Sequence, residues 1–386
     1  MSKKLVLVTT RFPLPLTNGF ANKNYWLIKG LSDQFDIYLH VIQKKPITNE
    51  EYLCIYKYCK TVKLYCPSLF DYFFGLLFSF LRDLPIQIGL FFSFKAKKAI
   101  SEDLKTASVA VCSVIRGAQY LMKYSGPLFS DLADSLAQQY LKDAERFSGL
   151  KRIIYREEGR RMKKYEKEVI ARSQRAFFFN KLEALIYEKY RVFVVPHGVN
   201  PELLSLNESS PDYGNGVVIF GKMDFEPNVD AALWFINNVL IKLPNEIKLY
   251  IVGANPDKRI KSIALHNSRV IVTGFVENPY PLIRGAIANL CPIQMGGGIQ
   301  NKVIEGLAVG AVGIVSSKAA SSMLDFQKTG LFLCDTPDEW AQKIIEIAAD
   351  RNSYSINRQM GREYANRHFS WSAYINEVKN HINYVG

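Results

Sequence analysis

The fold is decided by the stretch Met295-Gly296-Gly297-Gly298-Ile299-Gln300-Asn301-Lys302-Val303-Ile304-Glu305-Gly306-Leu307-Ala308. It follows the apolar residues 288–293, and apolar residues at helical spacing come after its glycines. The pattern therefore predicts a strand, a glycine-rich loop and a helix. Glycines at such a turn let a phosphate approach backbone N–H groups, and the start of a helix adds about half a positive charge.

The predicted helix has one polar and one apolar face. At about 100° per residue, Asn301, Lys302 and Glu305 share one face, while Val303 and Leu307 lie on the opposite face toward the sheet. We expect the polar face to be free to meet a ligand, with Lys302 neutralising a diphosphate and Glu305 accepting hydrogen bonds from ribose hydroxyls. The alternative is a flexible loop followed by a helix that carries an ordinary ion pair.

Short apolar stretches alternate with helical stretches on both sides of this segment. Such alternation predicts parallel sheets covered by helices on both faces, in a doubly wound α/β fold. We expect a surface helix in the charged residues 151–175 and closing helices at 337–350, 354–366 and 371–384. The predicted strands are 5–10, 35–41, 107–113, 127–134, 192–195, 217–220, 247–252, 270–273, 288–293, 313–316 and 331–334.

A chain of 386 residues, 48% hydrophobic and 22% charged, is a folded protein long enough for two domains. The predicted domain boundary falls where an apolar strand ends at Pro196-His197-Gly198, because proline and glycine interrupt regular secondary structure. We therefore predict a domain over 1–195 and a second over 196–369. A helix within 370–386 is expected to pack back on the first domain.

Cysteine spacing and the lengths of the apolar stretches argue against a disulfide-rich, zinc-binding, secreted or membrane-spanning protein. The six cysteines have neither zinc-ligand nor disulfide-framework spacing, which favours a reducing cytosol. The apolar stretch after Met1 is too short for a signal peptide. Polar residues interrupt the apolar region 69–94, so no transmembrane helix is predicted.

The net positive charge of the chain comes entirely from its first half. Residues 1–200 carry 32 Lys and Arg against 18 Asp and Glu, whereas the remainder is close to neutral within a total of +13. This asymmetry points to an anionic partner for that half. The aromatic-rich residues 69–81, followed by Lys95, Lys97 and Lys98, suit an anionic membrane interface or, alternatively, a buried helical hairpin. No nucleic-acid-binding module is visible, so no nucleic acid is expected.

Three segments carry a family resemblance, namely Gly297 to Glu305, Val195 to Val199 and Phe220 to Asn228. In order and spacing they resemble the donor domain of family-4-related bacterial glycosyltransferases of surface-polysaccharide synthesis (capsule, lipopolysaccharide, exopolysaccharide). The resemblance implies the GT-B fold, which consists of two Rossmann-like domains facing a central cleft. It also implies a nucleotide-diphosphate sugar as substrate, no further cofactor, and a lipid-linked or oligosaccharide acceptor on the cytoplasmic side of the membrane.

Carried over onto matching positions, the resemblance gives donor-site residues. Gly297, Gly298, Asn301, Lys302 and Glu305 would hold the donor at the glycine loop and the helix that follows it. Lys222 would approach the donor phosphates, and Gly19 would let the first loop pass close to the diphosphate. A surface turn is the alternative for both. His197 is expected at a hinge or a donor contact, or on a surface turn.

Two departures from the family pattern concern the chemistry. Retaining members carry a glutamate eight residues before Glu305, where this chain has Gly297, and often a histidine where Asp134 stands. Asp134 is therefore the candidate base of an inverting transferase. The alternatives are an N-cap role for Asp134 and retention with substrate-assisted chemistry. No Asp-X-Asp segment is present where a metal-dependent transferase would hold a cation, so a metal-independent enzyme is expected.

Other functions fit parts of the same pattern. A sugar-nucleotide epimerase or hydrolase would use the same diphosphate site, and a non-catalytic donor-binding scaffold would also keep it. A nicotinamide dehydrogenase fits less well, because the loop after residues 5–10 lacks Gly-x-Gly-x-x-Gly.

Overall fold

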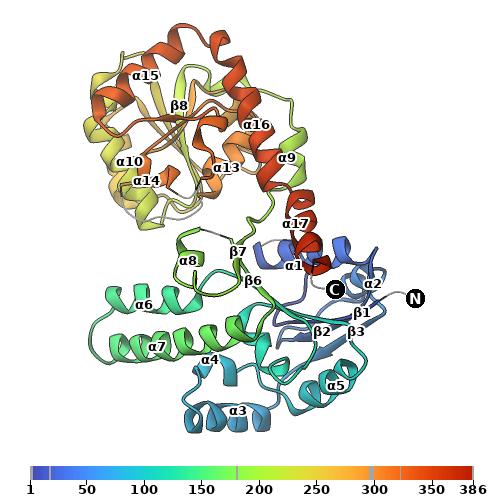
Figure 1. Cartoon of the computed structure of the whole chain (residues 1–386). Helices are drawn as coiled ribbons and strands as arrows, with labels where there is room; N and C mark the ends of the chain where they lie inside the picture. Colours follow the sequence, from blue (N-terminus) through green and yellow to red (C-terminus); the bar gives the residue numbers. More distant parts are fainter. Residues whose placement is uncertain (1–2, 17–18, 180, 295–299, 322, 385–386) are drawn as a thin grey trace. The chain divides into compact units, whose positions relative to one another are not determined.

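The structure is a computed structural model that describes residues 3–16, 19–179, 181–294, 300–321 and 323–384. The chain forms two compact units (Figure 1). Unit 1 consists of Met1–Pro196 and Tyr374–Gly386, and unit 2 of His197–Ala373.

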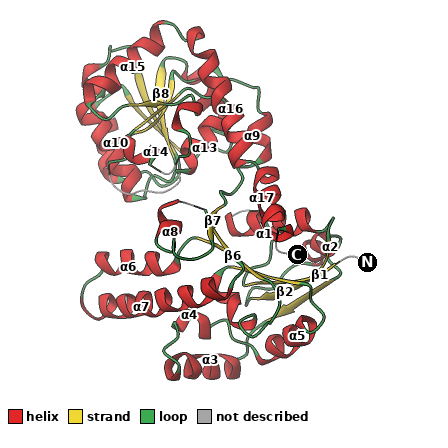
Figure 2. Ribbon diagram, in the orientation of Figure 1, coloured by secondary structure: helices red, strands yellow, loops and turns green. Residues whose placement is uncertain are grey.

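Unit 1 is built on a parallel sheet of seven strands among the described residues, in the order β3-β2-β1-β4-β5-β6-β7. Its central strands are runs of apolar residues, such as Leu5 to Val8, that are buried on both faces because helices cover both sides of the sheet (Figure 2). The strands are β1 (Lys3–Thr9), β2 (Phe35–Ile42), β3 (Thr61–Tyr65), β4 (Val109–Ser113), β5 (Leu128–Ala133), β6 (Arg175–Phe178) and β7 (Val192–Val194).

The helices of unit 1 connect these strands, and the last helix of the chain returns to it. They are α1 (Gly19–Leu31), α2 (Asn49–Tyr56), α3 (Leu69–Leu81), α4 (Ile86–Gly89), α5 (Phe94–Leu104), the 3₁₀ helix η1 (Ile115–Tyr120), α6 (Leu136–Arg146), α7 (Gly149–Arg172), α8 (Lys181–Leu185) and α17 (Trp371–Asn383), which enters unit 1 at Tyr374.

A buried polar cluster attaches α17 to this sheet. The carboxylate of Asp131, in β5, lies 3.1 Å from the ammonium group of Lys23 in α1 and accepts a hydrogen bond from the hydroxyl of Tyr374 in α17. All three side chains are almost fully buried. A buried charge pair is strongly destabilised by the loss of either partner, so this cluster fixes where the end of the chain docks.

Unit 2 repeats the same strand order with six described strands, β10-β9-β8-β11-β12-β13, all parallel. Two apolar clusters, one on each face of the sheet, form its core. The strands are β8 (Gly216–Phe220), β9 (Lys248–Val252), β10 (Val270–Gly274), β11 (Ala288–Cys291), β12 (Gly313–Val315) and β13 (Phe332–Leu333).

The helices of unit 2 are α9 (Pro201–Ser205), η2 (Pro211–Tyr213), α10 (Glu226–Asn238), η3 (Leu240–Lys242), α11 (Lys258–His266), α12 (Tyr280–Gly285), α13 (Asn301–Ala308), α14 (Ser317–Ala320), η4 (Phe326–Lys328), α15 (Pro337–Ala349), η5 (Asn352–Tyr354) and α16 (Ser355–Phe369). Val303 and Leu307 of α13 are buried in the core, as the sequence predicts.

The predicted α/β class and its parallel sheets are confirmed. The sequence-based prediction missed β3 and β6, and several predicted strands end one or two residues away from their observed bounds. None of the described helices is long and apolar enough to cross a membrane.

Candidate functional site

Unit 2 has a cavity of about 640 Å³ at the carboxyl ends of its strands. The loops after β8, β9 and β10 form part of its wall, and the beginning of α13, which follows β11, forms the rest. From β8 the chain moves to β9 on one side, and it later returns to β11 on the other side. The cavity therefore lies where the strand order reverses, which is where open parallel sheets bind their ligands.

Lys302, in the first turn of α13, is one of the polar groups of this cavity. Its side chain is buried rather than freely exposed, which corrects the expectation from helical spacing. The ammonium group donates a hydrogen bond to Oδ1 of Asn228 in α10, so a neighbouring helix covers it. Burial lowers the pKa of Lys302. An anion in the cavity would offset this desolvation.

Glu305 lies one turn further along α13 and also lines the cavity. One of its carboxylate oxygens accepts a hydrogen bond of 3.2 Å from the hydroxyl of Tyr280 in α12. Burial raises the pKa of Glu305 to about 7, and burial together with the nearby carboxylate raises the pKa of the Tyr280 phenol. Glu305 is therefore a hydrogen-bonding group whose charge changes near neutral pH.

Lys222 and Asn301 are more accessible. Asn301 begins α13 and Lys222 follows β8, and both line the cavity. The ammonium group of Lys222 lies 3.4 Å from the carboxylate of Asp224, and both side chains are exposed, so this ion pair is weak. Lys222 can therefore exchange its partner for a ligand phosphate.

The start of α13 provides backbone donors. Within the described residues, Gln300 precedes the helix without a side-chain capping bond, so amide groups of the first turn remain available for a ligand. Gly297 and Gly298, predicted to cradle the diphosphate, lie outside the residues that the structure describes.

Two glycines shape the opposite wall. Gly221 follows β8 with φ of 138°, and Gly253 follows β9 with φ of 152°. A Cβ atom on Gly253 would lie 1.7 Å from the carbonyl oxygen of Gly221. The two loops can approach this closely because residue 253 is a glycine, and the positive φ of both residues also favours glycine.

Asp134, the candidate base, belongs to unit 1 and is exposed directly after β5. The preceding residue, Ala133, has φ of 65°, a conformation that L-residues other than glycine seldom adopt and that is enriched at functional sites when the surrounding structure enforces it. Ser135, not Asp134, caps α6, because its hydroxyl accepts from the backbone N–H of Gln138. The alternative N-cap role for Asp134 is therefore wrong.

The structure shows where Gly19 and His197 lie, but it does not assign a function to either residue. Gly19 begins α1 in unit 1, and a Cβ atom there would meet nothing within 4 Å. His197 is the first residue of unit 2, and its Nδ1 lies 3.1 Å from the carbonyl oxygen of Gly198. Neither residue lines the cavity of unit 2.

Sequence reasoning missed Asn228 and Tyr280 as cavity residues, although both lie in it. Asn228 stands at the end of a segment that carried the family resemblance, which was a usable signal. No sequence signal pointed to Tyr280, because its hydroxyl reaches Glu305, 25 positions later in the chain, only in the folded protein. Among the described residues, no group of three or more His, Cys, Asp or Glu side chains is arranged to hold a metal ion.

The chain is similar to known proteins in part of its sequence and in its fold. Residues 214–350 match the family described as glycosyl transferases group 1. HepE from Anabaena in complex with UDP is 12% identical, with a TM-score of 0.63 over 99% of this chain and 100% of that chain. Sucrose-phosphate synthase from Thermosynechococcus elongatus is 14% identical, with a TM-score of 0.62 over 99% and 98%. The lipopolysaccharide outer core galactosyltransferase WaaB in its apo form is 14% identical, with a TM-score of 0.61 over 99% of both chains. No curated protein matches the chain.

Proposed function

We propose that this chain, a glycosyltransferase of GT-B fold, transfers a sugar from a nucleotide diphosphate in the cavity of unit 2 to a lipid-linked or oligosaccharide acceptor of a bacterial surface polysaccharide. The enzyme class follows from the match of residues 214–350 and from the fold. The donor site, the acceptor and the pathway are the parts that we propose.

The observation that carries the donor site is the position of Lys302 and Glu305 on α13, both lining one cavity at the reversal of the strand order. A diphosphate at the start of this helix would meet backbone N–H groups and the Lys302 ammonium. The ribose would then lie one turn deeper, at Glu305. Uridine is the first base to test, because HepE has been solved with UDP and with UDP-glucose.

Asp134 would act as the general base. Its carboxylate takes the proton of the acceptor hydroxyl, the hydroxyl oxygen attacks the anomeric carbon, and the bond from that carbon to the diphosphate breaks. The electron pair leaves on the phosphate oxygen, where Lys302 and Lys222 supply positive charge. Such a reaction inverts the anomeric centre and needs no metal ion for the leaving group.

The acceptor side is proposed to dock on an anionic membrane through α3. This helix buries its small and polar residues Asp71, Gly75 and Ser79. Gly75 packs so closely on α4 that a Cβ atom would lie 2.2 Å from the carbonyl oxygen of Gly89. Most of the large apolar side chains therefore face outward, which favours a docking surface over the alternative of a buried hairpin. They include Leu69, Phe70, Phe73, Phe80 and Leu81, each more than 60% exposed.

Basic residues lie next to this apolar surface. The carboxylate of Asp71 in α3 accepts a 2.9 Å hydrogen bond from the backbone N–H of Phe94, which begins α5. That contact brings Lys95, Lys97 and Lys98 of α5, all exposed, beside α3. Apolar side chains flanked by lysines favour the interface of an anionic bilayer, and we place the reaction on its cytoplasmic side.

The test is to incubate the purified protein with a radiolabelled UDP-sugar, with and without bacterial membranes as the source of acceptor. The proposal expects label in lipid-extractable or polymeric glycan only when membranes are present. Conversion of the donor sugar without membranes would indicate an epimerase, release of free sugar a hydrolase, and no turnover of any nucleotide sugar a binding scaffold.

A further inference from the structure

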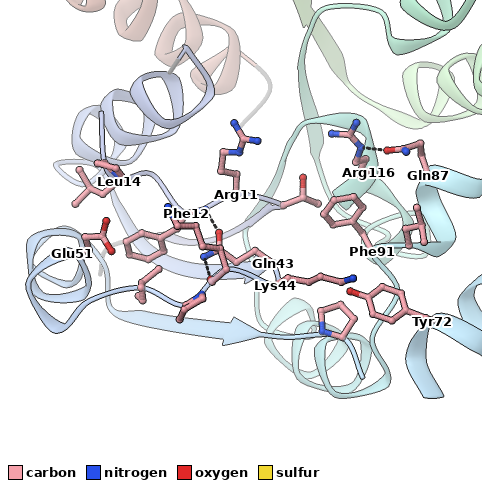
Figure 3. A pocket seen from close by; sticks show the side chains of 17 residues that line it. Arg11, Phe12, Leu14, Gln43, Lys44, Glu51, Tyr72, Gln87, Phe91 and Arg116 are labelled. Atoms are coloured by element: carbon pink, nitrogen blue, oxygen red, sulfur yellow. Dashed lines mark hydrogen bonds between the residues drawn. The ribbon is translucent and has the colours of Figure 1, made fainter. Parts of the chain in front are cut away.

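Unit 1 has its own cavity, of about 710 Å³, which the proposed donor site does not use (Figure 3). Its wall consists of Thr10 to Phe12 after β1, Gln43 to Ile47 after β2, Pro67 after β3 and Arg116 after β4. The strand order β3-β2-β1-β4 of unit 1 corresponds to β10-β9-β8-β11 of unit 2. This cavity is therefore the topological equivalent of the proposed donor cavity, at the second point where the strand order reverses.

The lining of this cavity is strongly cationic. Four positively charged side chains line it, those of Arg11, Lys44, Lys45 and Arg116. Among the described lining residues, Glu51 is the only one with a carboxylate, and that carboxylate accepts a 2.8 Å hydrogen bond from the backbone N–H of Thr48 in the capping box of α2. The acidic group is thus engaged with its own helix, and the charge of the cavity lining is predominantly positive.

Arg116 has unused hydrogen-bonding capacity. Its Nε donates to Oε1 of Gln87 at 2.9 Å, whereas its terminal nitrogens have no hydrogen-bond partner in the part of the chain that the structure describes. Burial lowers the pKa of Arg116, and the positive charge of Arg11 lowers it further. Two guanidinium groups that repel each other over a cavity favour an anion that can be shared between them.

The backbone before Arg116 is strained. Val114 has φ of 75°, a conformation that is an outlier for a β-branched residue. It lies between β4 and η1, so this turn directs the helix that carries Arg116. Backbone strain of this kind persists where the surrounding structure enforces it, and it is concentrated at ligand sites.

Aromatic rings accompany the cations. The ammonium group of Lys44 lies 4.4 Å from the ring centre of Tyr72, and the guanidinium carbon of Arg116 lies 5.4 Å from that of Phe91 (Figure 3). Cations beside aromatic faces suit a ligand that joins an anionic group to a sugar ring or an apolar chain. Tyr72 also belongs to α3, so the cavity adjoins the apolar surface proposed to meet the membrane.

We infer that the cavity of unit 1 binds the phosphate of the acceptor, and that the acceptor is accordingly a glycosyl phosphate or diphosphate rather than a neutral glycan. The phosphate would lie between Arg116, Arg11 and Lys44, with the adjoining sugar against Tyr72 and Phe91. This inference rests on the proposed function. The same chemistry belongs to a lipid-linked glycosyl diphosphate and to a free glycosyl phosphate.

The test is isothermal titration calorimetry with three probes, measured in saturating UDP so that the donor cavity is filled. The probes are N-acetylglucosamine 1-phosphate, N-acetylglucosamine, and a short-chain polyprenyl diphosphate N-acetylglucosamine. We expect both phosphorylated probes to bind and the neutral sugar to bind about tenfold more weakly or not at all. A tighter complex with the polyprenyl probe would identify the lipid as the source of the phosphate, and equal affinities would identify the free sugar phosphate.

Variants locate the binding. Arg116→Gln and Lys44→Gln should each weaken the phosphorylated probes about tenfold or more, while Lys123→Gln, an exposed lysine of unit 1 outside the cavity, should not. Lys44 lies exposed on a loop, where a substitution should not disturb folding, so Lys44→Gln still tests the inference if Arg116→Gln fails to fold. Unchanged affinity in both variants, or equal binding of the neutral sugar, would overturn the inference. Failure to bind UDP would instead contradict the proposed function.

Discussion

The ammonium group of Lys302 in α13 donates a hydrogen bond to the side-chain oxygen of Asn228 in α10. Both side chains are buried and both line the cavity of unit 2. Lys302 forms no ion pair with a carboxylate among the residues that the structure describes, so its buried charge has only a neutral partner. A bound diphosphate would supply the missing negative charge.

The first prediction concerns this lysine. Lys302→Gln should raise the Kd for UDP about tenfold to a hundredfold, because a hydrogen bond to a charged group contributes about 1.5 to 3 kcal/mol. Calorimetric titration of UDP measures this change. Lys261→Gln, an exposed lysine of the same unit outside the cavity, is the matched control and should bind UDP as the wild type does. Equal affinities of the two variants would remove Lys302 from the donor site.

A second prediction follows from the raised pKa of Glu305. The unfolded chain releases this proton near pH 4.5 and the folded chain at about 7, so the folded state binds more protons between these values. The group's contribution to the free energy of unfolding is present at low pH and is lost as the pH rises through 7, by roughly 3 kcal/mol in total. Urea titrations of wild type and Glu305→Gln from pH 4 to 8 should show this extra pH dependence only in the wild type. A constant difference between the two proteins would argue against a buried, titrating Glu305.

The same group should make donor binding depend on pH. Ribose hydroxyls donate to an ionised carboxylate more strongly than to a neutral one. The affinity for UDP-glucose should therefore rise between pH 6 and 8 in the wild type and stay flat in Glu305→Gln. Parallel pH profiles of the two proteins would show that Glu305 does not meet the ribose.

The third prediction separates catalysis from binding at Asp134. Asp134→Asn should lower kcat about 10² to 10⁴-fold, because the acceptor hydroxyl loses its base, while the Kd for UDP stays unchanged. The helix that follows should be unaffected, since Ser135 provides its cap. Glu145→Gln, which changes an exposed acid on that helix, α6, is the control. Transfer at the wild-type rate in Asp134→Asn would exclude it as the base.

The fourth prediction concerns the membrane. The double variant Phe73→Ser with Phe80→Ser should bind vesicles of anionic phospholipid at least tenfold more weakly, because burying one such side chain contributes about 1.5 to 3 kcal/mol. Both side chains are exposed in the protein, so its Tm should change little. Leu265→Ser with Ile356→Ser removes two exposed apolar side chains from unit 2 as a control. Co-sedimentation of both double variants to the same extent would contradict docking through α3.

Much of the fold could be predicted from local sequence. Buried strands such as β8 and β9 are continuous apolar runs, and their position between helical stretches gives the parallel sheets. The missed strands lack that signal. In β3, polar residues interrupt the apolar ones because it lies at the edge of its sheet, and β6 has only four residues and follows directly on the charged helix α7.

The candidate sites were predictable only in part. Lys302 and Glu305 share a face of one helix, which spacing reveals, but the cover on Lys302 comes from Asn228, 74 positions earlier in the chain. The cavity of unit 1 was missed because its four cations follow three different strands, β1, β2 and β4, and come together only in the folded protein. Its one usable signal is that basic residues stand directly after predicted strand ends, as Arg11 does after residues 5–10 and Lys44 after 35–41.

The most direct measurement is a crystal structure of the protein with UDP. The account predicts the diphosphate against the backbone N–H groups at the start of α13, within hydrogen-bond reach of Lys302, and the ribose hydroxyls at Glu305. UDP bound anywhere else, including the cationic cavity of unit 1, or with its ribose turned away from α13, would contradict the proposed donor site.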